Sequence, residues 1–296
     1  MAKPRYTIRQ FRQEFPNDDA CLDRIFRIRY GDNPTCSECK REGKFYRVKS
    51  RRSYACQWCG HQIYPCAGTP LEKSTTALSS WFYAMYLMVV TRNGVSAKEL
   101  ERQLGVTYKC AWRIGHKIRE LMDLLGMNKV MSGHVEVDET YVGGKTKGGK
   151  RGRGAEGKTV VFGVLECGAD VKGRVVSNVK RKTLQPIIRA NVKEGSKVSS
   201  DELTSYKDLS RLGYEHGVVS HGTGEYVAGT HHVNALEGFW SQLKRGITGT
   251  HMHVSAKHLP KYVGEFAFRY NNRKNPAGMF ARLLGNFAAP LPLGAG

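Results

Sequence analysis

Two Cys-x-x-Cys knuckles constrain the folding of this chain more than any other feature of its sequence. Cys36 and Cys39 form the first knuckle, Cys56 and Cys59 form the second, and 16 residues separate them. This spacing is typical of a tetrahedral site in which four thiolates bind zinc. The segment between the knuckles alternates like two strands around a basic turn, which predicts a hairpin. We therefore expect a zinc ribbon with one structural Zn²⁺, too small to fold without its metal.

The net charge limits the class of partner. The chain has 47 Lys and Arg against 26 Asp and Glu, a formal charge of +21. Repulsion among this many positive charges favours a polyanionic partner. Nucleic acid is the leading candidate, and a membrane surface is the second. No apolar run is long enough to span a membrane, and the N-terminus lacks the apolar core of a signal peptide. We therefore expect the chain to lie in the cytosol. A disulfide pair or a redox-active Cys-x-x-Cys motif, the two alternatives to a zinc site, is disfavoured there.

Helical periodicity between residues 70 and 130 predicts a helix-turn-helix bundle. One helix begins after Ser96, with Glu99 placed to close a capping box, and Gly105 lies where the turn needs a positive φ. Thr107 is expected to cap the next helix. Helix pairs joined by a Gly turn occur in many bundles, but the basic charge favours DNA binding here. The residues of this helix that we expect to contact DNA are Tyr108, Lys109, Arg113 and Lys117.

The following segment, residues 131–275, is predicted to be an α/β domain. Three strand-like runs are followed by alternating helices and strands, which predicts a mixed sheet with flanking helices. The strands are expected at 133–142, 159–166, 173–179, 196–201 and 215–220, and the helices at 183–194, 205–212 and 231–246.

A glycine-rich, polycationic loop lies between the first two of these strands. It is expected either to hold DNA phosphates or only to keep the chain in solution. Its basic residues are Lys145, Lys147, Lys150, Arg151 and Arg153.

The whole chain is thus expected to contain five segments. They are a helical segment (1–33), the zinc ribbon (34–69), the helix-turn-helix domain (70–130), the α/β domain (131–275) and a C-terminal tail (276–296).

Three acids of the α/β domain are candidates for a metal site. Asp138 lies inside the first strand and Asp201 at the end of the fourth. Burying such acids costs free energy unless a cation or a partner balances them. Glu237, on the helix at 231–246, could complete a set that holds two Mg²⁺ for phosphodiester chemistry. Glu139 is expected on the opposite face of its strand from Asp138.

The helix at 231–246 has an apolar stripe and a polar face. Glu237 and Lys244 share the polar face, about 10 Å apart along the axis. The alternative role of Glu237 is structural, in a capping box that Asn234 begins as the N-cap. The apolar stripe consists of Leu236, Phe239, Trp240 and Leu243.

Together these motifs resemble the bacterial insertion-sequence transposases of the DDE superfamily, in the ISXO-like branch with an N-terminal zinc ribbon. The resemblance covers nearly the whole chain. The segments that carry it are 137–144, Asp201 with Tyr206, 232–246, 257–262 and 265–273.

The resemblance implies an RNase-H-like catalytic domain that uses two Mg²⁺ or Mn²⁺ ions. It implies cleavage at the ends of the element and joining of the freed 3′ hydroxyls to target DNA. By this resemblance Asp138, Asp201 and Glu237 bind the metals, with Asn234 as the alternative third ligand, and Lys244, beside Arg245, contacts the transposon end.

Two transposon ends imply at least a homodimer on DNA during the reaction. Two other functions fit parts of the sequence: a DNA-binding regulator descended from a transposase, and an RNase-H-like nuclease without strand transfer. The intact acids argue against the regulator, and the ribbon with the helix-turn-helix favours end recognition over a simple nuclease.

Overall fold

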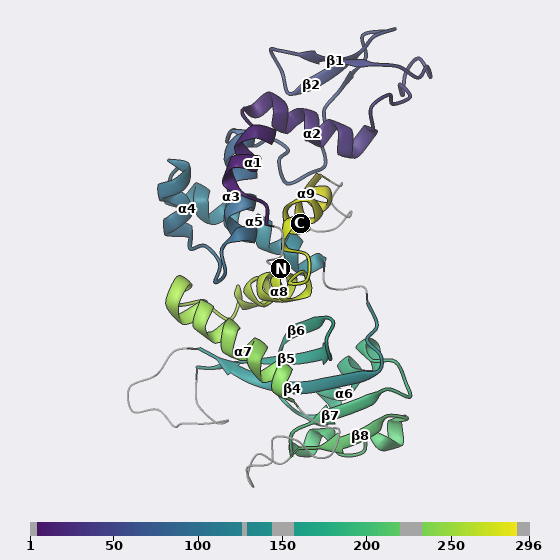
Figure 1. Cartoon of the computed structure of the whole chain (residues 1–296), viewed down its shortest axis with the longest axis vertical. Helices are drawn as coiled ribbons and strands as arrows, with labels where there is room; N and C mark the ends of the chain where they lie inside the picture. The colour runs from purple at the N-terminus through teal and green to yellow at the C-terminus, as the bar shows by residue number, and fades with distance from the viewer. Residues whose placement is uncertain (1–4, 126–128, 144–156, 220–232, 289–296) are drawn as a thin grey trace. The chain divides into compact units, whose positions relative to one another are not determined.

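The computed structural model describes residues 5–125, 129–143, 157–219 and 233–288, and the chain divides into two compact units (Figure 1). The first unit consists of Met1–Arg92, Ala97–Leu121 and Asn275–Gly296. The second consists of Asn93–Ser96 and Met122–Lys274. None of the described helices is long and apolar enough to cross a membrane.

The first unit begins with two short helices, as the sequence predicts, followed by the ribbon. Each helix is capped at its start, α1 by Thr7 and α2 by Asn17, whose side chains accept backbone N–H groups. The ribbon is an antiparallel sheet in the order β1-β2-β3, so the predicted hairpin is confirmed. The bounds are α1 Ile8–Glu14, α2 Asp18–Tyr30, β1 Phe45–Val48, β2 Ser53–Cys56 and β3 Gln62–Ile63.

The helical bundle of the first unit contains the predicted helix-turn-helix. Gly105 in the turn has a φ of +64°, a conformation that a residue with a side chain rarely adopts. The Cys110 N–H donates to Thr107 Oγ1 at 3.4 Å, so Thr107 caps the helix that follows. The helices are α3 Leu78–Val90, α4 Ala97–Leu104 and α5 Tyr108–Leu124.

The segment predicted as a tail contains a helix, α9, from Met279 to Ala288. Its Phe287 is fully buried and lies against Trp81 of α3, with ring centroids 5.5 Å apart. Phe280 contacts the rings of Phe11 and Phe15. Helix α9 therefore completes the apolar core of the first unit.

The second unit is built on a five-stranded sheet in the order β6-β5-β4-β7-β8. Strand β5 pairs antiparallel with both β4 and β6. Strand β7 runs parallel to β4, and β8 runs parallel to β7. The predicted α/β class, an RNase-H-like mixed sheet with flanking helices, is confirmed. Strand ends differ from the predicted ones by at most three residues: β4 His134–Val142, β5 Thr159–Glu166, β6 Val171–Val176, β7 Lys197–Ser200 and β8 Glu215–Val218.

Each face of this sheet carries its own apolar core. On one face, Val161 and Leu165 of β5 pack against Trp240 and Val263. On the other face, Phe162 and Val164 of the same strand pack against Leu184 and Ile188 of α6. The alternation of side chains along β5 thus provides both surfaces. The helices are α6 Arg181–Asn191, α7 Asn234–Gly246 and α8 Leu259–Asn271, and a π-helical turn, Ile247–His251, follows α7.

The helix predicted at 205–212 is wrong. Two short 3₁₀ turns, η1 at Thr204–Tyr206 and η2 at Ser210–Leu212, occupy this segment. Between them Lys207 is extended and Asp208 has a φ of +72°, so the backbone cannot continue an α-helix.

Strand β6 is an edge strand, and a side chain of α8 covers part of its edge. The Asn271 amide nitrogen donates to the Val171 carbonyl at 3.0 Å, and the Asn271 oxygen accepts from the Val171 N–H at 2.8 Å. Both outward backbone groups of Val171 are therefore satisfied from within the chain.

We predict that Phe287→Ala destabilises the first unit by about 3–5 kcal/mol, because it opens a cavity against Trp81. Gly285→Ala, on the same helix, is the matched control. A Cβ at Gly285 meets no atom within 4 Å, so this change should stabilise α9 by about 0.5–1 kcal/mol. Chemical denaturation of both variants measures this. Equal stability of Phe287→Ala and the parent chain would mean that α9 does not contribute to the core.

Candidate metal centres and nucleic-acid interface

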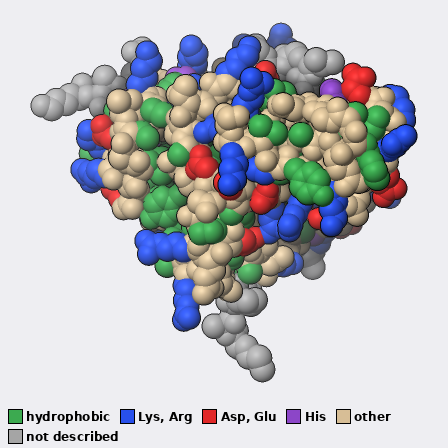
Figure 2. Space-filling model, turned by 90° about the horizontal axis from the view of Figure 1, so that it is seen from above, with side chains coloured by type: hydrophobic (Ala, Val, Ile, Leu, Met, Phe, Trp, Pro, Cys, Tyr) green, Lys and Arg blue, Asp and Glu red, His purple; other side chains and the backbone are tan. Residues whose placement is uncertain are grey.

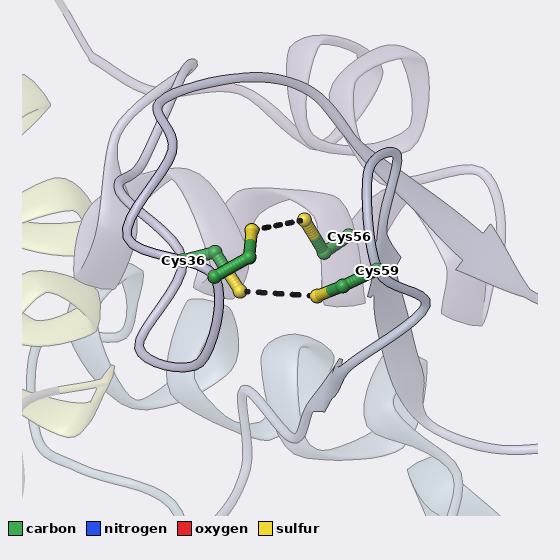
Figure 3. A group of neighbouring side chains, drawn as sticks. Cys36, Cys56 and Cys59 are labelled. Carbon is green, nitrogen blue, oxygen red and sulfur yellow. Dashed lines mark hydrogen bonds between the residues drawn. The ribbon is translucent and has the colours of Figure 1, made fainter.

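The four predicted zinc ligands converge in the ribbon. Figure 3 shows the sulfur atoms of the two knuckles pointing toward one another. Cys36 Sγ lies 3.6 Å from Cys59 Sγ, and Cys39 Sγ lies 3.8 Å from Cys56 Sγ. A tetrahedral zinc with bonds of about 2.3 Å sets its sulfurs about 3.8 Å apart, whereas a disulfide joins them at about 2.0 Å. The four-cysteine cluster therefore fits a structural zinc, and its cysteines are not joined by disulfides in this structure.

The two knuckles share one backbone design. The residue after each knuckle, Lys40 or Gly60, has a positive φ, and its N–H donates to the carbonyl of the first cysteine of the knuckle at 3.0 Å. The Cys39 backbone N–H also lowers the pKa of the Cys36 thiol to about 6. Such N–H groups favour the thiolate form that a metal requires.

The register between β4 and β7 brings Asp138 and Asp201 together. His134 pairs with Lys197 and Glu136 with Ser199 in this parallel ladder. The offset is 63 residues (197 − 134), and Asp138 and Asp201 are also 63 residues apart (201 − 138). Asp201 is the first residue beyond β7, so it lies level with Asp138 at the carboxyl end of that strand.

Glu139 joins this pair, which the sequence analysis did not anticipate. Carboxylate oxygens of Asp138, Glu139 and Asp201 all lie within 4.8 Å of one another. Glu139 does leave β4 on the face of Tyr206, opposite Asp138, and the Tyr206 hydroxyl donates to its Oε2 at 2.7 Å. Because β7 ends at Ser200, the Glu139 carboxylate can reach the same point as the two Asp carboxylates. The only feature of the sequence that could have indicated Glu139 as a member of this set is its position next to Asp138.

Trp240 of α7 fixes the position of Asp138. The indole N–H donates to Asp138 Oδ2 at 3.0 Å. The ring lies over Gly163, the cross-strand neighbour of Asp138, where a Cβ would come within 2.5 Å of the indole. Burial, with the nearby Glu139 and Asp201 carboxylates, raises the pKa of Asp138 to about 8. A cation at this point would relieve that cost.

The start of α7 differs from the predicted cap. Asn234 is the first helical residue and makes no side-chain capping bond, so the predicted N-cap is wrong. The buried Glu136 of β4 takes this role instead, because its Oε2 accepts the Leu236 N–H at 2.7 Å. A strand carboxylate thus ties the helix start to the sheet.

Glu237 lies on the first turn of α7 and is exposed. Within the described residues it is outside the set of three converging carboxylates. Trp240 follows Glu237 by three residues and precedes Lys244 by four, so all three lie on neighbouring turns of one side of the helix. The pKa of Lys244 is lowered by burial, and the Asp138 carboxylate partly offsets this effect.

The residues expected to contact DNA are only partly covered by the structure. On α5, Tyr108 is 50% exposed, and Lys109 and Arg113 are also exposed, while Lys117 pairs with Glu120 at 3.1 Å. On α7, Arg245 is exposed. Figure 2 shows Lys and Arg side chains spread over one face of the molecule instead of gathered in a single patch. The loop residues Lys145, Lys147, Lys150, Arg151 and Arg153 lie outside the described residues.

Comparison with known proteins gives the family. Residues 130–271 match the ISXO2-like transposase domain, and residues 16–62 match the transposase zinc-ribbon domain. A Haemophilus influenzae protein described as transposase-like is 33% identical over 98 residues, which cover 33% of this chain and 78% of that protein. The chain belongs to the ISXO2-like transposase family.

A second relative extends the match over most of the transposase. It is a protein in the transposable element ISH50 of Halobacterium salinarum, 27% identical over 282 residues, which cover 88% of this chain and 94% of the relative. The predicted membership of this transposase family is therefore confirmed. The two matched domains indicate that the transposase binds DNA.

We predict that the purified transposase contains one zinc ion per chain. Cys36→Ser and Cys59→Ser should each release the metal and unfold the ribbon, because structural zinc binding is folding free energy. Cys66→Ala is the control, since Cys66 is buried but outside the four-cysteine cluster. Elemental analysis with limited proteolysis measures this; a folded ribbon without zinc would contradict the assignment.

Proposed function

We propose that this transposase recognises the ends of an insertion sequence, cleaves them, and joins the 3′ hydroxyl ends to target DNA. The observation that carries the proposal is the meeting of Asp138 and Asp201 at the end of β7, inside the domain that matches the transposase family. Asp201 is buried and Asp138 is half-buried, and two carboxylates this close repel each other unless a cation binds between them. The pair therefore suits metal-dependent phosphodiester chemistry better than a structural role.

Asp138, Asp201 and Glu237 are the residues that would hold two Mg²⁺ or Mn²⁺ ions. Carboxylate oxygens are the ligands these ions prefer, and the oxygens of Asp138 and Asp201 converge. The part of Glu237 in this proposal rests on the resemblance to the DDE transposases. When bound, such ions activate the attacking oxygen and stabilise the leaving oxygen of a phosphodiester. Within the chain, Trp240 keeps the Asp138 carboxylate oriented through the indole N–H. Lys244, in the last turn of α7, would hold a DNA phosphate through its positive charge.

End recognition is assigned to the first unit together with basic segments of the second. The exposed face of α5 offers Tyr108, Lys109 and Arg113 to a DNA groove, with Lys117 further along the helix. The zinc ribbon and Arg245 would add contacts to the DNA backbone. The basic residues of the 143–158 loop serve the same purpose in this proposal. Because two ends must be joined, the working form is at least a homodimer on DNA.

We predict that Asp138→Asn, Asp201→Asn and Glu237→Gln each reduce end cleavage and joining by several orders of magnitude, with DNA binding retained. Asn234→Ala is the control for Glu237. Asn234 is exposed and is not the N-cap of α7, so its removal should change stability by less than about 0.5 kcal/mol and activity only slightly.

The assay follows cleaved ends and joined product separately on a DNA that carries the inverted repeats of the element. An inactive, folded Asn234→Ala with an active Glu237→Gln would make Asn234 the third ligand. Cleavage without any joined product would favour a nuclease over a transposase activity.

We further predict that DNA affinity falls about a thousandfold between 50 and 200 mM salt, as expected when six or more phosphates are neutralised. Lys109→Ala and Arg113→Ala should each reduce the salt slope by about one. Lys129→Ala is the control, because Glu166 at 2.6 Å and Asp170 at 3.3 Å already neutralise that lysine. Equilibrium binding at several salt concentrations measures the slope, and salt-independent affinity would contradict the electrostatic interpretation.

A further inference from the structure

Glu139 has no role in the three-acid site proposed above, yet the structure places its carboxylate there. One of its oxygens lies within 4.8 Å of oxygens from both Asp138 and Asp201. Glu139 and Asp201 are both 8% exposed. A third carboxylate at this distance increases the repulsion among the acids, so the cluster favours a bound cation more strongly than two acids alone would.

Tyr206 holds Glu139 in this position. The tyrosine is fully buried in the core against α6, and its hydroxyl donates to Glu139 Oε2 at 2.7 Å. Tyr206 belongs to η1, which begins three residues after Asp201, so one short segment carries both Asp201 and the residue that orients Glu139. A carboxylate has about four acceptor positions on its two oxygens, so one bond to a hydroxyl is compatible with binding a cation as well.

The neighbouring Glu136 shows how a purely structural acid on the same strand is arranged. It is 0% exposed, and its two oxygens face the Leu236 N–H at 2.7 Å and the Cys167 thiol at 3.6 Å. Those partners come from the helix α7 and the end of β5, away from the converging set. Glu139 differs because its near neighbours include two further carboxylates.

We infer that Glu139 is a ligand of the catalytic metals, and that Tyr206 is the positioning residue that aims it. The inference rests on the proposed function, because the metals are those of the same site. It adds a fourth carboxylate to the site and gives Tyr206 a specific task.

The test is metal binding measured by thermal unfolding of the full chain over a titration with Mn²⁺ and, separately, with Mg²⁺. A cation that binds only the folded chain raises the unfolding temperature, and the rise grows with the logarithm of the cation concentration divided by its Kd. Glu139→Gln keeps an oxygen that can accept from Tyr206, so it should preserve the metal-free unfolding temperature and weaken metal affinity at least about tenfold. Tyr206→Phe should also weaken affinity about tenfold, since it frees the carboxylate from its orientation.

Glu136→Gln is the matched control, because it makes the same change on the same strand outside the cluster and keeps an oxygen that can accept the Leu236 N–H at the start of α7. It should leave metal affinity unchanged even where it lowers the metal-free unfolding temperature. Asp138→Asn reports on the site as a whole and should abolish the metal response.

The outcomes separate the two proposals. If Asp138→Asn loses the response while Glu139→Gln binds metal like the parent chain, Glu139 is only a hydrogen-bond partner of Tyr206, and the proposed function stands without this inference. If the parent chain shows no response to either metal, both proposals fail. A loss in Glu139→Gln at constant metal-free stability supports the inference.

Discussion

Three consecutive residue pairs between β4 and β7 fix the level at which the acids of this transposase meet. The offset of this parallel ladder equals the separation of Asp138 and Asp201 along the chain. A slip of one residue in the register would turn the side chains of β7 to the opposite face and separate the two carboxylates. The apolar cores on both faces of the sheet prevent such a slip. The packing of the domain therefore fixes the register of β4 and β7, and this register fixes the positions of the two acids.

The helix α7 depends on this ladder as well. Its first turn is bound by Glu136, two residues before Asp138, and its Trp240 donates to Asp138 itself. Gly163 makes room for the indole between the helix and the sheet. One segment of β4 thus provides both the anchor of α7 and the Asp138 carboxylate of the candidate metal site. Glu237 and Lys244 lie on a helix that cannot shift without disturbing Asp138.

The sequence predicted the features whose cause is local. The zinc ligands follow from a short repeat, the strands and helices from periodicity, and the turn at Gly105 from the one residue type that tolerates its backbone. Features that arise from distant contacts were missed. The cap of α7 comes from Glu136, 100 residues away, and Tyr206 orients Glu139 across 67 residues. The docking of α9 likewise depends on Trp81, far earlier in the chain, so a short apolar pattern near the C-terminus did not reveal it.

The bond pair between Asn271 and Val171 has a consequence for the sheet as a surface. An edge strand is a template on which a second chain can add a strand, and uninterrupted edges promote aggregation. Here a side-chain amide imitates the peptide group of such a neighbour and takes both hydrogen bonds at Val171, the first residue of β6. An incoming strand would have to break these bonds before it could align with β6 from its beginning. A single asparagine thus hinders the addition of a second chain at the beginning of this edge.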